Sequence, residues 1–259
     1  AADGQFQTLG SLRVARQYHR TVVLPDGRLL VTGGDGWLGE PPSAELVDPV
    51  SGAVRDTGAP VESRADHTAT VLGDGRVLLV GGIGTDGEQA FGISDTAEIW
   101  DPATEEFRLV EGRLSVARVG HGAAVLPDGR VLVVGGWTTG AEYALAEIFD
   151  PATETFSPVP SPDDRLRLEH TVLQLDDGSV LVMGGGVLAD DPGAGLLPSD
   201  SVLRFFADGT GAEVLPGLAE TRALASAALT TDGRAFLFGG LAGWQATARA
   251  ESYSPAQGP

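Results

Sequence analysis

The sequence RVGHGAAVLPDGRVLVVGGWTTGAEYALAEIFDP, residues 118–151, decides the fold of this chain. Two apolar runs flank an Asp-Gly pair at 128–129, and the second run ends in two glycines. Asp and Gly tolerate the positive φ of a tight turn, so the pattern predicts a β-hairpin. A third strand is expected at 146–151. The stretch therefore predicts a small antiparallel sheet.

The same pattern recurs along the whole chain, and a fixed period indicates a repeat architecture. Asp-Gly turns lie at 26–27, 74–75, 128–129, 177–178 and 232–233. Consecutive turns are therefore 48, 54, 49 and 55 residues apart. Glycine pairs follow at 33–34, 81–82, 135–136, 184–185 and 239–240. The third strand recurs at 44–49, 97–102, 146–151 and 250–255, and the fourth copy departs from it at 201–206. A fourth strand carries an aromatic residue, as at Phe107 and Phe156.

The full pattern resembles the kelch repeat: Arg-x-x-His, apolar run, Asp-Gly-Arg, apolar run, Gly-Gly, then Ala-Glu-apolar-aromatic-Asp-Pro. The resemblance covers essentially the whole chain, and its weakest copy is the fifth, where Ala225 replaces the histidine. Kelch repeats form four-stranded blades around a central channel. The resemblance implies an all-β, five-bladed kelch-type β-propeller as a single domain over residues 1–259. Blades are expected at about 19–57, 67–110, 121–159, 170–216 and 225–255.

The two ends of the chain suggest how the ring closes. The fifth unit has no fourth strand, and residues 5–9 have the pattern of an orphan fourth strand. We expect this N-terminal strand to complete the last blade, because pairing it there removes two open sheet edges.

Composition excludes several classes of function. The chain has no cysteine, so it has no disulfide, no thiolate nucleophile and no Tyr–Cys radical site of the kelch-like sugar oxidases. All 17 basic residues are arginine, which excludes a Schiff-base lysine. The lack of Lys and Asn is typical of a GC-rich bacterium or a haloarchaeon. A net charge of −19 argues against nucleic acid and anionic membranes as partners. We expect a soluble monomer, secreted or cytoplasmic.

Function in such a propeller is expected in the loops at one face. One loop set precedes the inner strands, at about 10–19, 58–67, 111–121, 160–170 and 217–226. The other set follows each glycine pair, at about 35–43, 83–96, 137–145, 186–200 and 241–249. The second set varies most between copies and contains three of the four tryptophans. Ligand-binding candidates on this aromatic rim are Trp37, Trp137, Trp244, Tyr143 and Phe91; the alternative for the tryptophans is packing between loops.

Residues that occur in every repeat are better explained by structure. The histidines at 19, 67, 121 and 170 share one position, so we expect no metal site and no cofactor, although imidazole is a common ligand. Arginines at 16, 64, 118, 167 and 222 and glutamates at 45, 98, 147 and 251 are expected to form ion pairs. The alternative is that the arginine ring recognises a carboxylate.

The residue before each histidine is not repeated. It is Tyr18, Asp66, Gly120 and Glu169 in the first four units, and Leu224 in the fifth, where Ala225 replaces the histidine. Catalytic candidates are Asp66 and Glu169 as an acid–base pair, with Tyr18 and His67. The alternative is that both carboxylates are solvated loop residues.

Three functions stay open. The first is binding of a small-molecule or carbohydrate-like ligand at the mouth of the channel. The second is a non-redox enzyme, a lyase, isomerase or cyclase, at the same mouth. The third is a protein-interaction module, because the kelch resemblance itself gives a fold and no activity.

Overall fold

The structure is a computed structural model that describes residues 8, 10–34, 42–85, 91–138, 145–163, 167–188, 196–243 and 245–254. Within these ranges it contains strands and turns and no helix, so the prediction of an all-β chain is confirmed. Among these residues there is accordingly no helix of the length and apolarity that a membrane span requires.

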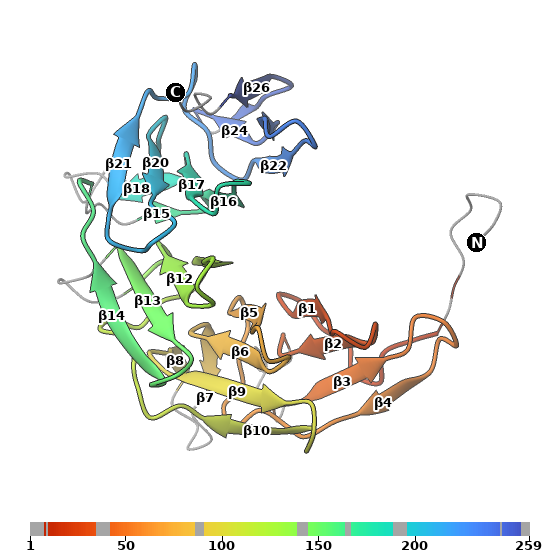
Figure 1. The fold of residues 1–259 in the computed structure, drawn as a ribbon. Coiled ribbons are helices and arrows are strands. Elements are labelled where there is room, and N and C mark those ends of the chain that lie inside the picture. Colours follow the sequence, from red (N-terminus) through yellow and green to blue (C-terminus); the bar gives the residue numbers. More distant parts are fainter. Residues whose placement is uncertain are drawn as a thin grey trace. The chain divides into compact units, whose positions relative to one another are not determined.

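Antiparallel sheets with one strand order recur along the described chain (Figure 1). The first sheet contains β1 (Arg20–Val23), β2 (Leu29–Thr32), β3 (Ala44–Val47) and β4 (Val54–Asp56). The second contains β5 (Thr68–Val71), β6 (Val77–Val80), β9 (Ala97–Asp101) and β10 (Glu106–Leu109). The third contains β11 (Gly122–Val125), β12 (Val131–Val134), β13 (Ala146–Asp150) and β14 (Thr155–Val159).

The last two sheets follow the same order. The fourth contains β16 (Thr171–Gln174), β17 (Val180–Met183), β20 (Val202–Phe205) and β21 (Ala212–Leu215). The fifth contains β22 (Ser226–Leu229), β23 (Ala235–Phe238) and β26 (Ala250–Tyr253). Smaller sheets follow three glycine pairs: β7 (Ile83–Thr85) with β8 (Phe91–Ile93), β18 (Gly186–Leu188) with β15 (Arg167–Leu168) and β19 (Leu196–Pro198), and β24 (Leu241–Ala242) with β25 (Gln245–Ala246).

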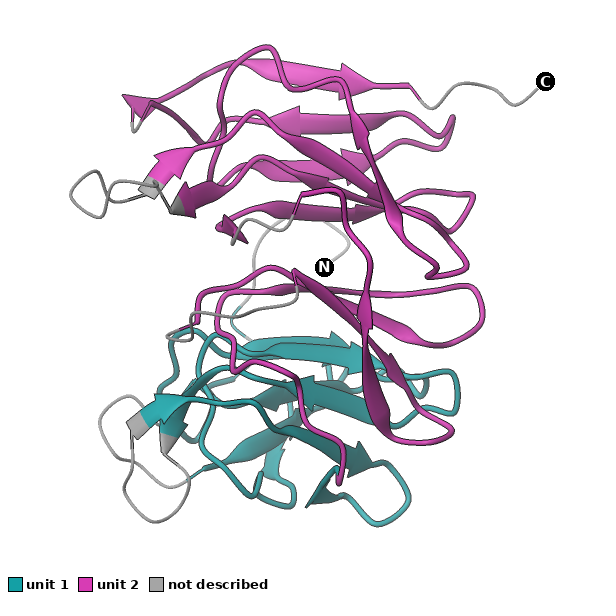
Figure 2. Cartoon of the chain, turned by 90° about the vertical axis from the view of Figure 1, so that its left-hand side faces the viewer, with its two compact units in different colours: residues 1–110 teal, residues 111–259 magenta. Residues whose placement is uncertain are grey.

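The chain divides into two compact units, residues 1–110 and 111–259 (Figure 2). The first unit contains the first two sheets, and the second unit contains the other three. Residues 5–7 and 9 lie outside the described residues, so strand closure stays a prediction, as do the single domain and the number of blades.

Neighbouring sheets within each unit pack through buried side chains. In the first unit Leu30 and Leu46 pack with Trp100, which is fully buried and donates from Nε1 to Oγ1 of Thr57 at 3.1 Å. In the second unit one core joins the third and fourth sheets and another joins the fourth and fifth. Strand β17 (Val180–Met183) is buried on both faces, because Val180 and Val182 contribute to the first of these two cores and Leu181 and Met183 to the second.

The glycine pairs allow successive repeats to approach closely. A Cβ at Gly33 would lie 2.1 Å from the carbonyl oxygen of Arg64 and 2.8 Å from Cε1 of His67. A Cβ at Gly135 would lie 2.4 Å from Cε1 of His170. Both glycines also have positive φ, at 63° and 69°. Glycine is therefore required here because the histidine of the next repeat packs against it.

Candidate functional site

The repeated arginines are buried and hold their own repeats together. The expected Arg–Glu ion pairs are present: Arg16–Glu45 at 2.8 Å, Arg64–Glu98 at 3.0 Å, Arg118–Glu147 at 2.7 Å and Arg222–Glu251 at 2.8 Å. The guanidinium of Arg64 also donates to the carbonyl of Gly81 at 2.8 Å, and the backbone carbonyl of Arg64 accepts from the amide of Gly34 in the preceding repeat at 2.7 Å. These guanidinium groups are at most 4% exposed, which leaves them little access to a ligand.

The fourth repeat replaces the missing glutamate with a carboxylate from another segment. Leu203 pairs with Val182 where Glu147 pairs with Val133 in the third sheet, and Leu203 lies in the core. Arg167 instead forms an ion pair with Asp163, four residues earlier, at 2.5 Å. The sequence offered no repeat signal for Asp163, and this residue was missed.

The histidines lie between repeats. His67, a predicted catalytic residue, is fully buried, with Nε2 2.9 Å from Oγ1 of Thr32 in the preceding repeat. Burial lowers its pKa well below 6.5, and the charges of Arg64 and Arg20 lower it further. Both ring nitrogens of His170 are shielded from solvent, although the residue as a whole is only partly buried. Its pKa falls to about 4, chiefly through burial of the ring.

No group of three or more metal-ligating side chains occurs in the part of the chain that the structure describes. The repeated histidines instead occupy positions where the imidazole packs against backbone of the neighbouring strands, as His170 does at Gly135. The structural interpretation of this set therefore explains their recurrence.

The residues before the histidines share an unusual backbone conformation. We call them the rim residues: Tyr18, Asp66, Gly120, Glu169 and Leu224. Their φ angles are 56°, 52°, 66°, 54° and 56°, in the left-handed region that favours glycine. Within the first unit the amide of Asp66 donates to the carbonyl of Tyr18 at 2.8 Å, and within the second the amide of Leu224 donates to the carbonyl of Glu169 at 2.9 Å. Tyr18 is 57% and Leu224 is 56% exposed.

In the second to fifth repeats the two loop sets meet at one end of the sheet. Bridges join Ala65 to Ile83, Val119 to Trp137 and Ala223 to Leu241, and β15 pairs with β18 in the fourth repeat. Each bridge joins the residue beside a rim residue to the segment after the glycine pair. Trp137 is 42% exposed and lies opposite Val119, the neighbour of Gly120. An aromatic side chain is thus placed beside the rim position that has no side chain.

The other aromatic candidates cannot be placed in the same way. Trp37, Tyr143 and Trp244 lie outside the described residues. The backbone of Phe91 pairs with Thr85 in the β7–β8 hairpin, while its side chain lies outside the described part.

One rim residue forms an ion pair that the sequence reasoning missed. Nη2 of Arg20 lies 2.9 Å from Oδ1 of Asp66, and the two side chains are 38% and 32% exposed. Arg20 occupies the position after the histidine, where the other repeats have Thr68, Gly122, Thr171 and Ser226. This break in the repeat was visible in the sequence. Asp66 belongs to the first unit and Glu169 to the second, so their action as an acid–base pair stays a prediction.

The comparisons with known proteins agree with this architecture. The family model for the kelch motif matches residues 117–162, which include the stretch that decided the fold. The chain has an all-β, kelch-like propeller fold. The solved structure of YjhT is similar over 90% of this chain and 75% of that chain, with a TM-score of 0.69 and 16% identity. No curated protein matches the sequence.

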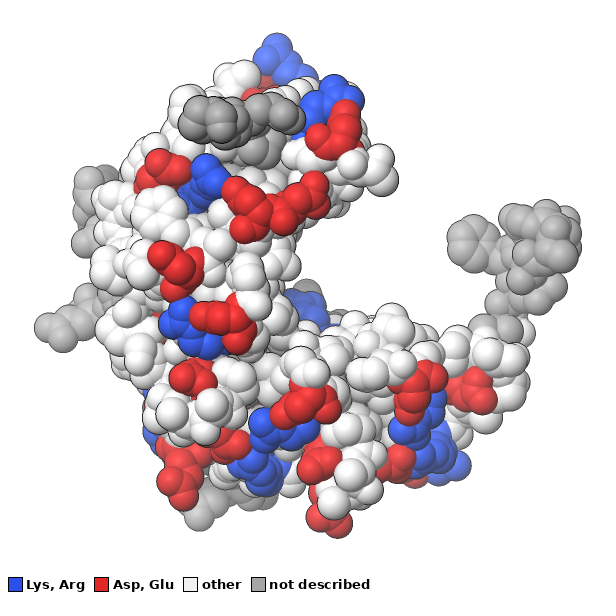
Figure 3. Space-filling model, in the orientation of Figure 1, with Lys and Arg blue, Asp and Glu red and all other residues white. Residues whose placement is uncertain are grey.

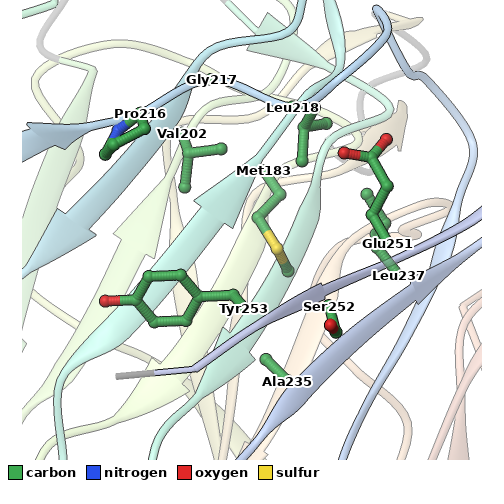
Figure 4. Close-up of a pocket in the computed structure, with 10 residues that line it drawn as sticks. All are labelled: Met183, Val202, Pro216, Gly217, Leu218, Ala235, Leu237, Glu251, Ser252 and Tyr253. Atoms are coloured by element: carbon green, nitrogen blue, oxygen red, sulfur yellow. The ribbon is translucent and has the colours of Figure 1, made fainter. Parts of the chain in front are cut away.

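A separate pocket of about 200 Å³ lies between the fourth and fifth sheets. Its lining is largely apolar and includes Met183 and Val202 of the fourth sheet and Leu237 and Tyr253 of the fifth, all labelled in Figure 4. Its one carboxylate, Glu251, is already bound by Arg222 and by the amide of Ala219. The pocket is smaller than the usual 300–1,000 Å³ of ligand sites and contains none of the rim residues.

On the face shown in Figure 3, the acidic residues of the described chain are interspersed with arginine. Several acidic residues form short-range pairs with arginine in turns, as Asp74 does with Arg76 at 2.7 Å. On this face the negative charge is therefore spread over the surface.

Proposed function

We propose that this chain binds a small molecule or sugar-like ligand at its rim residues, within the first unit at Tyr18 and Asp66 or within the second at Glu169 and Leu224, where Trp137 supplies an aromatic wall. The kelch propeller fold supports a binding or an enzymatic propeller. The observation that carries the proposal is the left-handed backbone at the five rim positions, four of which keep a side chain.

Glycine is the residue that this backbone favours, and Gly120 shows that glycine fits the position. A side chain there costs roughly 1 kcal/mol or more in local strain. Tyr18 and Leu224 recover little of that cost by packing, because each is more than half exposed. Exposed side chains that are retained on a rigid scaffold despite backbone strain are typical of a functional surface.

The chemistry of the rim suits a mixed polar and apolar ligand. In each unit a largely exposed residue with apolar surface, Tyr18 or Leu224, is hydrogen-bonded through its backbone to a residue with a carboxylate, Asp66 or Glu169. A carboxylate accepts hydrogen bonds from hydroxyl or amino groups. Trp37, Trp244, Tyr143 and Phe91 stay predictions as ligand-binding residues. Binding is preferred over acid–base catalysis because it needs no direct pairing of Asp66 with Glu169.

The proposal is tested by titration calorimetry with a panel of neutral sugars, polyols and small aromatic compounds. Replacing Leu224 or Tyr18 with glycine keeps the backbone conformation and removes the side chain, so binding should weaken at least tenfold while the protein stays folded. The matched control is Glu154→Gly. Glu154 has the same left-handed conformation, with φ of 54°, but lies in the β13–β14 turn at the other end of its sheet.

Two results would contradict the proposal. One is equal loss of affinity in the rim variants and in Glu154→Gly. The other is the absence of any bound small molecule together with capture of a protein partner that depends on the same side chains, which would favour the interaction module.

A further inference from the structure

We propose that the Arg20–Asp66 pair, with Tyr18 beside it, binds a small zwitterion, whose carboxylate contacts Arg20 and whose cationic group contacts Asp66. The inference rests on the proposed function and names the ligand class at the part of the rim that belongs to the first unit.

The scaffold directs Arg20 toward the second repeat. Arg20 pairs with Thr32 across β1 and β2. Thr32 contacts the imidazole of His67, and Arg20 contacts the carboxylate of Asp66. The backbone of Asp66 is held in turn by its hydrogen bond to the carbonyl of Tyr18. All the members of the cluster are thus fixed by contacts between the first two repeats.

The pair leaves hydrogen-bonding groups available. Among the described residues the guanidinium of Arg20 has one contact, from Nη2 to Oδ1 of Asp66, although a guanidinium carries five N–H donors. The second carboxylate oxygen of Asp66 has no protein partner in the same part of the chain. Both side chains are about one-third exposed, at 38% and 32%. Such a pair adds little to stability, so stability alone does not account for a charged residue at this one copy of the position.

Arg20 and Asp66 place a positive and a negative group 2.9 Å apart. They favour a ligand that has a negative group to contact Arg20 and, beside it, a positive group to contact Asp66. A simple anion is attracted by Arg20 and repelled by Asp66, and a net charge of −19 disfavours it further. A simple cation meets the converse repulsion from Arg20. A zwitterion placed antiparallel to the pair satisfies both groups, and bidentate contact with a carboxylate suits the guanidinium. Tyr18, 57% exposed and adjacent to Asp66 through the backbone bond, supplies a ring for the cation.

The test is titration calorimetry with glycine betaine and L-phenylalanine as probes. Each probe is compared with its methyl ester, which has lost the carboxylate charge and keeps the cation. L-Phenylalanine is also compared with its N-acetyl derivative, which has lost the cation and keeps the carboxylate. We expect the zwitterions to bind at least tenfold more tightly than either form, and Arg20→Gln and Asp66→Asn each to remove that preference. The matched control is Arg76→Gln, which breaks the similar Arg76–Asp74 pair in the β5–β6 turn and should leave affinity unchanged.

The outcomes separate this inference from the proposed function. If neutral sugars bind in a way that depends on Tyr18 and Leu224 while zwitterions bind no better than their singly charged forms, the inference is overturned and the proposed function stands. If no small molecule binds, both fail. If Arg20→Gln retains the preference for zwitterions, or Arg76→Gln also loses that preference, the inference is overturned. Thermal unfolding of each variant checks that the comparison is made on folded protein.

Discussion

Acidification should destabilise this protein through its buried neutral histidines well before its carboxylates protonate. The pKa of His170 is about 4 in the folded chain, against about 6.5 when unfolded. Because the folded pKa is the lower one, the unfolded state binds the proton first, and stability falls as pH drops from 6.5 toward 4. Integrating this difference between pH 7.5 and pH 5 gives a loss of about 2 kcal/mol for this histidine.

His67 acts in the same direction, because burial also lowers its pKa well below 6.5. Glu105 acts in a lower window. Its pKa is lowered to about 2, chiefly by hydrogen bonds from Arg55 and Arg28, so its contribution is present above pH 4.5 and is lost only below it. The histidines should therefore dominate the change between pH 7.5 and pH 5.

The assay is urea unfolding followed by tryptophan fluorescence at several pH values in this range. His170→Gln should reduce the pH-dependent loss by about 2 kcal/mol, whatever its own effect on stability at pH 7.5. Val172→Ala is the control, because it removes packing beside His170 and no titrating group. A stability that is unchanged between pH 7.5 and pH 5, or a slope that His170→Gln leaves intact, would refute the assignment of neutral interrepeat imidazoles.

Two further predictions concern the places where one repeat compensates for a lost residue. Asp163→Asn removes the carboxylate that pairs with the buried guanidinium of Arg167 at 2.5 Å, and this change should cost about 3 kcal/mol in urea unfolding. Glu213→Gln at the exposed Arg204 pair should cost far less, and an equal small loss in both variants would contradict the compensation. Ala225→His should cost about 2 kcal/mol, because the larger side chain overpacks the core beside Met183. Met183→Val should relieve most of that cost, since the third repeat has the smaller Val134 at the position of Met183. Additive effects in the double-mutant cycle would show that the two positions are not coupled.

The repeat pattern was sufficient to predict the strands of the repeated sheets and the ion pairs within the repeats. The Asp-Gly pair at 128–129 predicted the β11–β12 hairpin, and Gly129 has the expected positive φ of 88°. The Arg–Glu pairs were also predictable, because both members recur with a fixed spacing and opposite charge. These features are local or periodic, and a single sequence contains all the information that specifies them.

The features that the sequence reasoning missed depend on contacts between segments with no repeat signal. Asp163 reaches Arg167 from a connecting segment, so its role follows from the tertiary position of that segment. The types of residue at Tyr18, Glu169 and Leu224 do not predict their shared left-handed conformation, because they have neither size nor charge in common. Arg20 is a different case. The sequence shows that it breaks the repeat pattern, but only its 2.9 Å contact with Asp66 in the structure indicates a role for it.

The rim positions combine a fixed backbone with a variable side chain, and that combination explains why function would concentrate there. The neighbouring histidine and arginine are committed to contacts within and between repeats, so a substitution at either disturbs the scaffold. The rim residue between them contributes its backbone to the same contacts, as the amide of Asp66 does to Tyr18, while its side chain points away from the core. Different side chains can therefore occupy these positions without changing the way the repeats dock. The differences among Tyr18, Asp66, Glu169 and Leu224 are then available to specify a ligand, with Gly120 and Trp137 completing the series at the third repeat.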